Sequence, residues 1–189
     1  MSLCIPPIMG GEHGITKTET INKSFCEKII QLSKKSSYKS SKVYDTEGKL
    51  SNVIKIREVD VWRIHEKEEW LDTFLIEQVV RANETFQYNL SGLLERPQLL
   101  RYNSPTNGYD WHSDLGIGDA SNRKLSCSIL LNDNFSGGNL EFFLNGKQTC
   151  DMKVGDCLLF SSFISHRVTR VTKGERWALV AWFSGPQFR

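Results

Sequence analysis

Two stretches in the first half of the chain place hydrophobic residues at helical spacing. Ser24 and Glu27 have the Ser-x-x-Glu form of a capping box, which predicts that a helix begins near Ser24. A longer helical pattern runs from residue 66 to residue 88, and Ser91-Gly92 follows as a stop signal. Its apolar positions are Trp70, Leu71, Phe74, Leu75, Val79, Ala82 and Phe86.

The rest of the first half carries weaker patterns. Residues 1–15 contain Pro-Pro and Gly-Gly pairs and predict a loose arm. Residues 33–49 are rich in Ser and Lys, which predicts an exposed, mobile loop. Residues 53–64 alternate and are rich in β-branched side chains, so we expect a strand or two there.

After Pro97 the pattern changes to short apolar runs separated by turn signals. Eight runs follow: QLLRY, YDWHSD, KLSCSILL, NLEFFL, KQTCDM, DCLLF, SHRVTRV and RWALVAWF. Asn145-Gly146 lies between two of them and favours a type I′ hairpin turn. Two helices followed by about eight short antiparallel strands predict an α+β fold that is mainly β. We expect a double-stranded β-helix (jelly roll) with N-terminal helices packed on one outer face.

Length and composition narrow the picture. A chain of 189 residues with 39% hydrophobic residues suits one domain, comprising the arm (1–15), helical support with outer strands (16–96) and a jelly-roll core (97–185). The formal net charge of +2 gives no reason to expect nucleic-acid binding. No apolar run approaches the ~20 residues of a membrane span, and the N-terminus has no signal-peptide pattern. Five scattered cysteines without a CxxC motif suit reduced thiols, so we expect a cytoplasmic protein.

Candidate chemistry lies with two of the four histidines. His13 is in the arm and His65 opens the long helix, so structural or solvated roles are expected for both. His112 and Asp114 are two residues apart on a predicted strand and therefore share a face, while His166 follows 54 residues later. Two imidazoles and one carboxylate form the facial triad that non-heme Fe(II) oxygenases use. The alternative is a hydrogen-bonded surface pair.

An arginine on the last strand adds a second signal. Arg176 shares its strand face with three apolar residues, namely Ala178, Val180 and Trp182. A guanidinium buried among them needs an anion to offset its desolvation. That anion is either an internal carboxylate, Asp156 or Glu141, or a dicarboxylate ligand held bidentately.

In order and spacing, residues 97–185 resemble the iron(II)/2-oxoglutarate-dependent dioxygenases, and the prolyl 4-hydroxylase-like branch is the most similar. The resemblance implies that His112, Asp114 and His166 ligate Fe(II) and that Arg176 binds the distal carboxylate of 2-oxoglutarate. Tyr102 matches a tyrosine that lines the cosubstrate pocket in this family. Collagen-type members have lysine at the arginine position, and some prolyl hydroxylases carry a further tyrosine near the position of Leu130.

Since that tyrosine is missing, the hydroxyl that assists Arg176 is expected from Tyr102, Ser126 or Ser128. Tyr109 and Trp111 should alternate away from His112 and serve as packing or substrate-rim residues. Arg167 and Arg170 are expected to be solvated.

The resemblance implies hydroxylation of an aliphatic C–H bond, a peptidyl proline first, with O₂ consumed and succinate and CO₂ released. It also implies Fe(II) and 2-oxoglutarate as cofactor and cosubstrate, with ascorbate as a possible reductant and a protein or peptide as substrate. The oligomeric state is left open. Residues 33–49 are either a lid over the site or a plain mobile loop. Two alternatives remain, a small-molecule oxygenase and a non-catalytic jelly-roll binding module.

Overall fold

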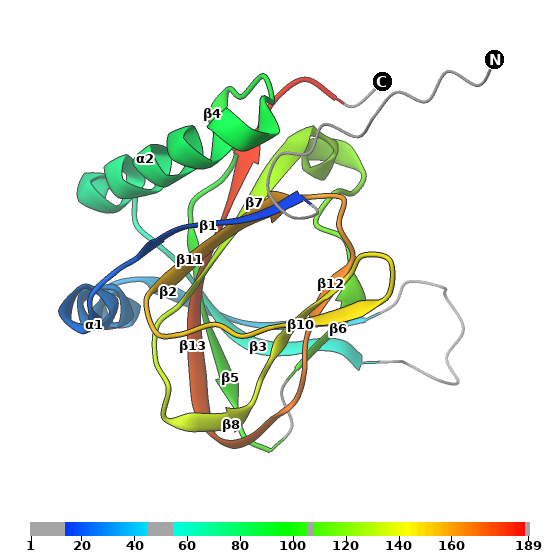
Figure 1. Cartoon of the computed structure of the whole chain (residues 1–189). Coiled ribbons are helices and arrows are strands. Elements are labelled where there is room, and N and C mark those ends of the chain that lie inside the picture. Colours follow the sequence, from blue (N-terminus) through cyan, green and yellow to red (C-terminus); the bar gives the residue numbers. More distant parts are fainter. Residues whose placement is uncertain (1–13, 45–54, 106–107, 188–189) are drawn as a thin grey trace.

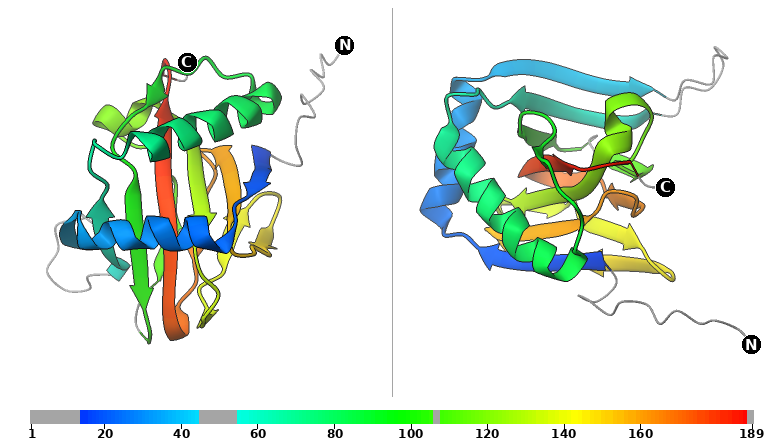
Figure 2. Two further views of the ribbon diagram at one scale, coloured as in Figure 1. Left: turned by 90° about the vertical axis from the view of Figure 1, so that its left-hand side faces the viewer. Right: turned by 90° about the horizontal axis from the view of Figure 1, so that it is seen from above.

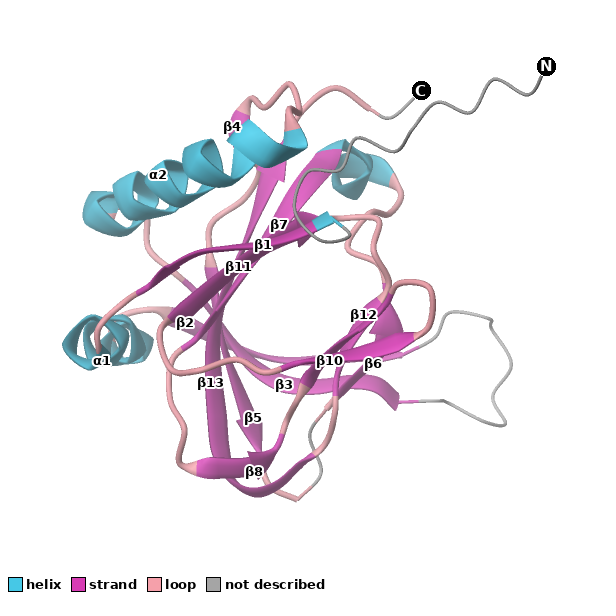
Figure 3. Ribbon diagram, in the orientation of Figure 1, coloured by secondary structure: helices cyan, strands magenta, loops and turns pink. Residues whose placement is uncertain are grey.

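The computed structural model describes residues 14–44, 55–105 and 108–187, and these form a β-barrel with helices on one side (Figures 1 and 3). The α-helices are α1 (Lys23–Gln31) and α2 (Glu69–Phe86), and the 3₁₀ helices are η2 (Leu32–Lys34) and η3 (Gly118–Asn122). Strands β1 to β7 are Ile15–Thr20, Ser37–Tyr44, Lys55–Arg63, Gly92–Leu93, Gln98–Asn103, Tyr109–His112 and Arg123–Leu130. Strands β8 to β13 are Phe135–Gly137, Leu140–Phe143, Lys147–Cys150, Asp156–Ser161, His166–Val168 and Val171–Ser184.

The strands follow one path, β1-β11-β7-β13-β5-β3-β6-β12-β9-β10. We call the part from β1 to β3 the major sheet and the part from β6 to β10 the minor sheet. β2 extends the major sheet from β3, while β4 and β8 pair with β13. A single residue pair, Arg57 with Tyr109, joins β3 to β6. The two sheets face one another across the barrel (Figure 1), which confirms the predicted jelly-roll class.

Strand alternation divides the hydrophobic core into two layers. On β13, Leu179 and Phe183 point outward and pack under the helices with Leu71 and Leu75 of α2. Both helices cover this outer face of the major sheet (Figure 2), as the sequence predicts. The second layer fills the barrel interior and includes Tyr102 and Phe142. Neither α-helix in the described residues is long and apolar enough to cross a membrane.

One prediction about the N-terminal half is wrong. Residues 37–44 of the predicted loop form β2, paired with β3 along its length; backbone pairing does not require an apolar pattern, and polar residues are common on exposed edge strands. Residues 45–49 of that loop, and residues 1–13 of the arm, lie outside the described residues. Residues 15–20 form β1 against β11. The strand predicted over residues 53–64 is confirmed as β3, and its Val59 and Val61 belong to the barrel interior.

The predicted helices exist, but their ends differ from the prediction. The N-cap of α1 is Asn22, whose side chain accepts a hydrogen bond from the Phe25 amide at 2.9 Å. Ser24 instead donates to Asn22, so the expected Ser24 capping box does not form. α2 ends earlier than Ser91-Gly92, at Gln87, which takes a left-handed conformation with φ 54°. The predicted hairpin at Asn145-Gly146 joins β9 to β10, and both residues have positive φ.

Candidate active site

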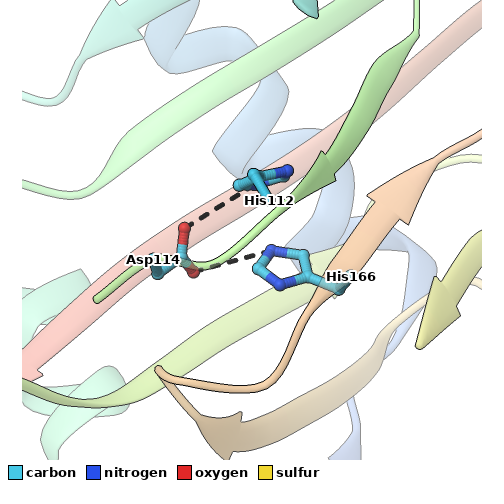
Figure 4. A group of neighbouring side chains, drawn as sticks. All are labelled: His112, Asp114 and His166. Carbon is cyan, nitrogen blue, oxygen red and sulfur yellow. Dashed lines mark ion pairs between the residues drawn. The ribbon is translucent and has the colours of Figure 1, made fainter. Parts of the chain in front are cut away.

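The three residues of the predicted triad meet inside the barrel. His112 ends β6 and His166 begins β12, and these two residues are direct partners in the antiparallel pairing. Asp114 follows two residues after His112, just beyond the strand. One ligand atom from each side chain lies within 4.8 Å of the others, and Figure 4 shows the carboxylate facing both imidazoles. Asp114 Oδ1 is 3.8 Å from His112 Nε2, and Asp114 Oδ2 is 3.7 Å from His166 Nε2.

Backbone carbonyl groups fix the orientation of both imidazoles. His112 Nδ1 is 2.7 Å from the carbonyl oxygen of Asp110, and His166 Nδ1 is 3.0 Å from that of Ile164. A carbonyl oxygen only accepts, so each Nδ1 carries the proton and donates. With Nδ1 engaged by a carbonyl group, each ring has its Nε2 directed toward Asp114, which is how metal-binding histidines are held in proteins.

Asp114 is arranged to remain ionised. Burial alone would raise the pKa of its carboxyl group. The charges of His166 and His112, with hydrogen bonds from Ser126 and Trp182, outweigh burial and lower the pKa below its ordinary value. An anionic carboxylate beside two Nε2 lone pairs is a suitable donor set for a divalent transition metal.

Arg176 lines the same cavity as the triad. It is 2% exposed, its Nε has no hydrogen-bond partner, and burial lowers the pKa of its guanidinium. In the described residues no carboxylate pairs with it. Asp156 accepts from Thr20 at 2.6 Å and Glu141 from Arg167 at 2.7 Å, so neither acts as the internal partner considered from the sequence.

The candidate pocket residues divide into two groups. Tyr102 and Ser128 line the cavity, and the Tyr102 ring centroid is 5.4 Å from the guanidinium carbon of Arg176. Ser126 is not among the residues that line the cavity. Its hydroxyl instead donates to Asp114 Oδ2 at 2.7 Å. Strand alternation gives Ser126 and Ser128 one face but does not determine which part of the site each serves.

Tyr109 does not alternate away from His112 as predicted. Its ring stacks on the His112 ring, with centroids 3.4 Å apart and an interplanar angle of 12°, and it lines the cavity. The cause is a bulge in the pairing of β6 with β12, because His166 faces His112 while Val168 faces Tyr109. Three residue steps on one strand therefore match two on the other, which moves Tyr109 to the His112 side.

Trp111 does turn away from His112. Its ring centroid is 6.0 Å from that of Phe143, and the Arg167 guanidinium lies over its ring. Arg167 is not simply solvated as predicted, because it also forms an ion pair with Glu141.

Two further residues shape the site without having been predicted to do so. Trp182 donates to Asp114, although the sequence shows it only as an apolar member of the Arg176 face. Gly138, seen from the sequence as a turn residue, has φ +64°, and a Cβ there would lie 2.8 Å from Cδ of Arg176.

His65 is exposed and takes no part in the site, as expected, and His13 lies outside the described residues.

Comparison with known proteins agrees with this geometry. Residues 97–184 match the family model of the 2OG-Fe(II) oxygenase superfamily. This segment belongs to that superfamily. A PKHD-type hydroxylase from Thermosynechococcus vestitus is 30% identical over 127 residues, covering 63% of this chain and 57% of the relative. One from Hyphomonas neptunium is 33% identical over 93 residues, covering 46% and 42%. The chain thus spans about half the length of these curated relatives.

Solved structures resemble this chain over nearly its whole length. A Pseudomonas putida prolyl-4-hydroxylase matches with a TM-score of 0.69 and 17% identity, covering 93% of this chain and 94% of that one. A Trichoplax adhaerens prolyl hydroxylase, in complex with a hypoxia inducible factor peptide fragment, matches with a TM-score of 0.71 and 19% identity, covering 92% and 84%. At these identities the likeness shows the fold.

Proposed function

We propose that this chain is an Fe(II)- and 2-oxoglutarate-dependent dioxygenase that hydroxylates an aliphatic C–H bond, with a peptidyl proline as the first candidate. Turnover releases succinate and CO₂. The observation that carries the proposal is a buried arginine with an unpartnered Nε in the same cavity as a two-histidine, one-carboxylate group. The buried guanidinium requires an anion and the triad offers three ligand atoms to one ion, and Fe(II) and 2-oxoglutarate together would meet both requirements.

His112, Asp114 and His166 are the proposed ligands of Fe(II). Their orientation supports this role, because both Nε2 lone pairs and the carboxylate are directed into one small volume before any ion is bound. Three protein ligands leave coordination positions for the cosubstrate and O₂. When bound, the iron supplies the redox chemistry that couples decarboxylation of 2-oxoglutarate to hydroxylation.

Arg176 is the proposed partner of the distal carboxylate of 2-oxoglutarate. A buried guanidinium without an anion is unfavourable, and a planar fork of donors suits a carboxylate. Tyr102 and Ser128 line the same cavity, so either hydroxyl is a candidate second donor to that carboxylate. With this cosubstrate in place, the charge of Arg176 is offset by the ligand rather than by the protein.

A peptide is the proposed substrate. The solved prolyl hydroxylase from Trichoplax adhaerens holds a peptide fragment, and its fold matches this chain. Ascorbate is proposed as an accessory reductant only. The four described cysteines are free thiols, which suits a reducing compartment such as the cytoplasm.

The test is reconstitution of the purified protein with Fe(II) and 2-oxoglutarate, with and without ascorbate and a panel of proline-containing peptides. We expect succinate release that depends on Fe(II), and peptide products heavier by one oxygen atom. The Arg176→Met variant provides the matched control, because it retains the triad. Iron-dependent succinate release without any modified peptide would favour a small-molecule substrate. No succinate under any condition would favour a binding module and contradict the proposal.

A further inference from the structure

The carboxylate of Asp114 is held by a hydrogen-bond chain from the neighbouring strands. Ser126 on β7 is 1% exposed and donates to Asp114 Oδ2 at 2.7 Å. Its oxygen also lies 3.0 Å from the hydroxyl of Ser162, which is fully buried. An ionised carboxylate only accepts, so the single proton of Ser126 points to Asp114 and Ser162 must donate to Ser126. The chain therefore has one direction, from Ser162 through Ser126 to Asp114.

The backbone around Asp114 is held separately from its side chain. The carbonyl oxygen of Ser162 accepts from the Ser113 hydroxyl at 3.0 Å and from the Leu115 amide at 2.9 Å. Arg123 donates to the carbonyl oxygen of Asp114 at 3.1 Å. These contacts fix where the residue sits after β6 ends, but they leave the rotation of the carboxylate undetermined.

We propose that Ser126 is the positioning residue that sets the orientation of the Asp114 carboxylate for metal binding. This inference rests on the proposed function, which assigns Asp114 as a metal ligand. Asp114 Oδ2, the atom that Ser126 holds, faces His166, while Oδ1 faces His112. With the plane of the carboxylate fixed beforehand, the ion meets three ligands already directed at one point. Hydrogen bonds to ligating carboxylates contribute to metal affinity in this way.

The same geometry argues against a direct role of Ser126 toward 2-oxoglutarate. Its one proton is committed to Asp114, so it has no donor to offer a second carboxylate. Ser128, two residues along β7, lines the cavity with Arg176. The two serines on this face thus serve different parts of the site, Ser126 the metal ligand and Ser128 the cosubstrate cavity.

The test is anaerobic titration with Mn(II) in the absence of 2-oxoglutarate, following free Mn(II) by electron paramagnetic resonance. We expect Ser126→Ala to raise the Mn(II) dissociation constant about 10- to 100-fold. Ser162→Ala, one link further from the carboxylate, should have a smaller effect, and Ser126→Thr should recover most of the affinity. Ser161→Ala is the matched control. It removes a hydroxyl that is also buried and is bonded to Tyr88 at 2.8 Å, and its Mn(II) affinity should equal that of the wild type.

Several outcomes overturn the inference. If Ser126→Ala binds Mn(II) as tightly as the wild type, or if Ser161→Ala loses as much affinity, Ser126 has no specific positioning role. Should Ser126→Ala fail to fold, Ser162→Ala carries the test, and unchanged affinity there overturns the inference as well. A wild-type protein that binds no Mn(II) removes the proposed function and this inference together. The wild-type titration therefore separates the two failures.

Discussion

Tyr109 lies flat on His112, with ring centroids 3.4 Å apart and planes inclined by 12°. This contact exists because a bulge lets β6 present both residues to the barrel interior. It restrains the imidazole on one face, while the hydrogen bond to the Asp110 carbonyl fixes its tautomer. The Tyr109 ring therefore restricts rotation of the His112 imidazole. The Asp110 carbonyl keeps a proton on its Nδ1.

Replacing Tyr109 with Leu should weaken metal binding without unfolding the protein. An aromatic pair of this kind is worth about 0.5–1.5 kcal/mol, so we expect a roughly two- to tenfold rise in the Mn(II) dissociation constant. Tyr109→Phe keeps the ring and should stay near the wild-type value. Equal loss in both variants would assign the effect to the hydroxyl instead of the stacked ring.

Removing a proposed ligand should have a larger effect. We expect His166→Ala and Asp114→Ala each to reduce metal affinity by more than the roughly 100-fold upper range for residues outside the ligand set. The fold should survive, because the barrel interior is largely apolar. Metal titration and thermal melting of the same samples check both points. His166→Ala with full 2-oxoglutarate decarboxylation would contradict the ligand assignment.

Arg176→Met tests the cosubstrate cavity. Losing a charge-assisted bidentate pair should reduce 2-oxoglutarate affinity by about 2–3 kcal/mol, or roughly 30- to 100-fold. Arg176→Lys should fall between, since a point charge replaces a planar fork. Metal binding should persist in both. Since no described carboxylate pairs with Arg176, the melting temperature of Arg176→Met should not fall. A lower melting temperature with unchanged 2-oxoglutarate affinity would indicate an internal partner.

Gly138 should be required for the placement of Arg176. A Cβ at Gly138 would lie 2.8 Å from Arg176 Cδ, so Gly138→Ala should lower 2-oxoglutarate affinity. Gly118→Ala is the matched control, because Gly118 has a similar φ of +68° but nothing within 4 Å of an added Cβ. Both variants should lose about 1–2 kcal/mol of stability to backbone strain. Isothermal titration with 2-oxoglutarate distinguishes them, and a matching loss in Gly118→Ala would exclude the steric explanation.

Asp156 gives the fold a pH dependence of known sign. Burial would raise its pKa, but hydrogen bonds from Thr20 and the Lys153 amide, with the charge of Lys17, lower it below the ordinary 3.8. The folded state therefore binds this proton less readily than the unfolded state. The stabilisation is fully present above the ordinary pKa and is lost as pH falls through the lowered folded value. Asp156→Asn should be less stable near neutral pH and show a flatter decline in acid, measured by chemical denaturation across pH. A decline as steep as that of the wild type would assign the acid sensitivity to other groups.

Most of the site could be predicted from the sequence for two reasons. Strand alternation shows which side chains share a face, and a charged or metal-ligating side chain is conspicuous among apolar neighbours. Arg176 among Ala178 and Val180 is such a case, and so is His112 beside Asp114. The jelly roll followed from short apolar runs and the Asn145-Gly146 turn. These signals are local, because the side chains that share a face of one strand still share it after the strands pair in the barrel.

What could not be predicted depends on contacts between distant strands. The position of Tyr109 depends on a bulge in the pairing of β6 with β12. The role of Ser126 depends on Asp114, which follows β6, coming within hydrogen-bond distance of β7. The sequence does not predict β2, because residues 37–44 have a polar pattern and the structure shows them in backbone pairing with β3. A lid formed by residues 37–44 is therefore not supported, since these residues extend the major sheet.

The strand path runs from β1 to β10, and in the described part of the chain these two end strands do not pair with each other. His112 and His166 belong to the minor sheet, whereas Arg176 and Ser126 belong to the major sheet. A ligand reaching from the triad to Arg176 would cross from one sheet to the other, near the junction where one residue pair joins β3 to β6. Such a ligand would link the two sheets through the barrel interior. Its binding should therefore stabilise the barrel in addition to the hydrogen bonds between the strands.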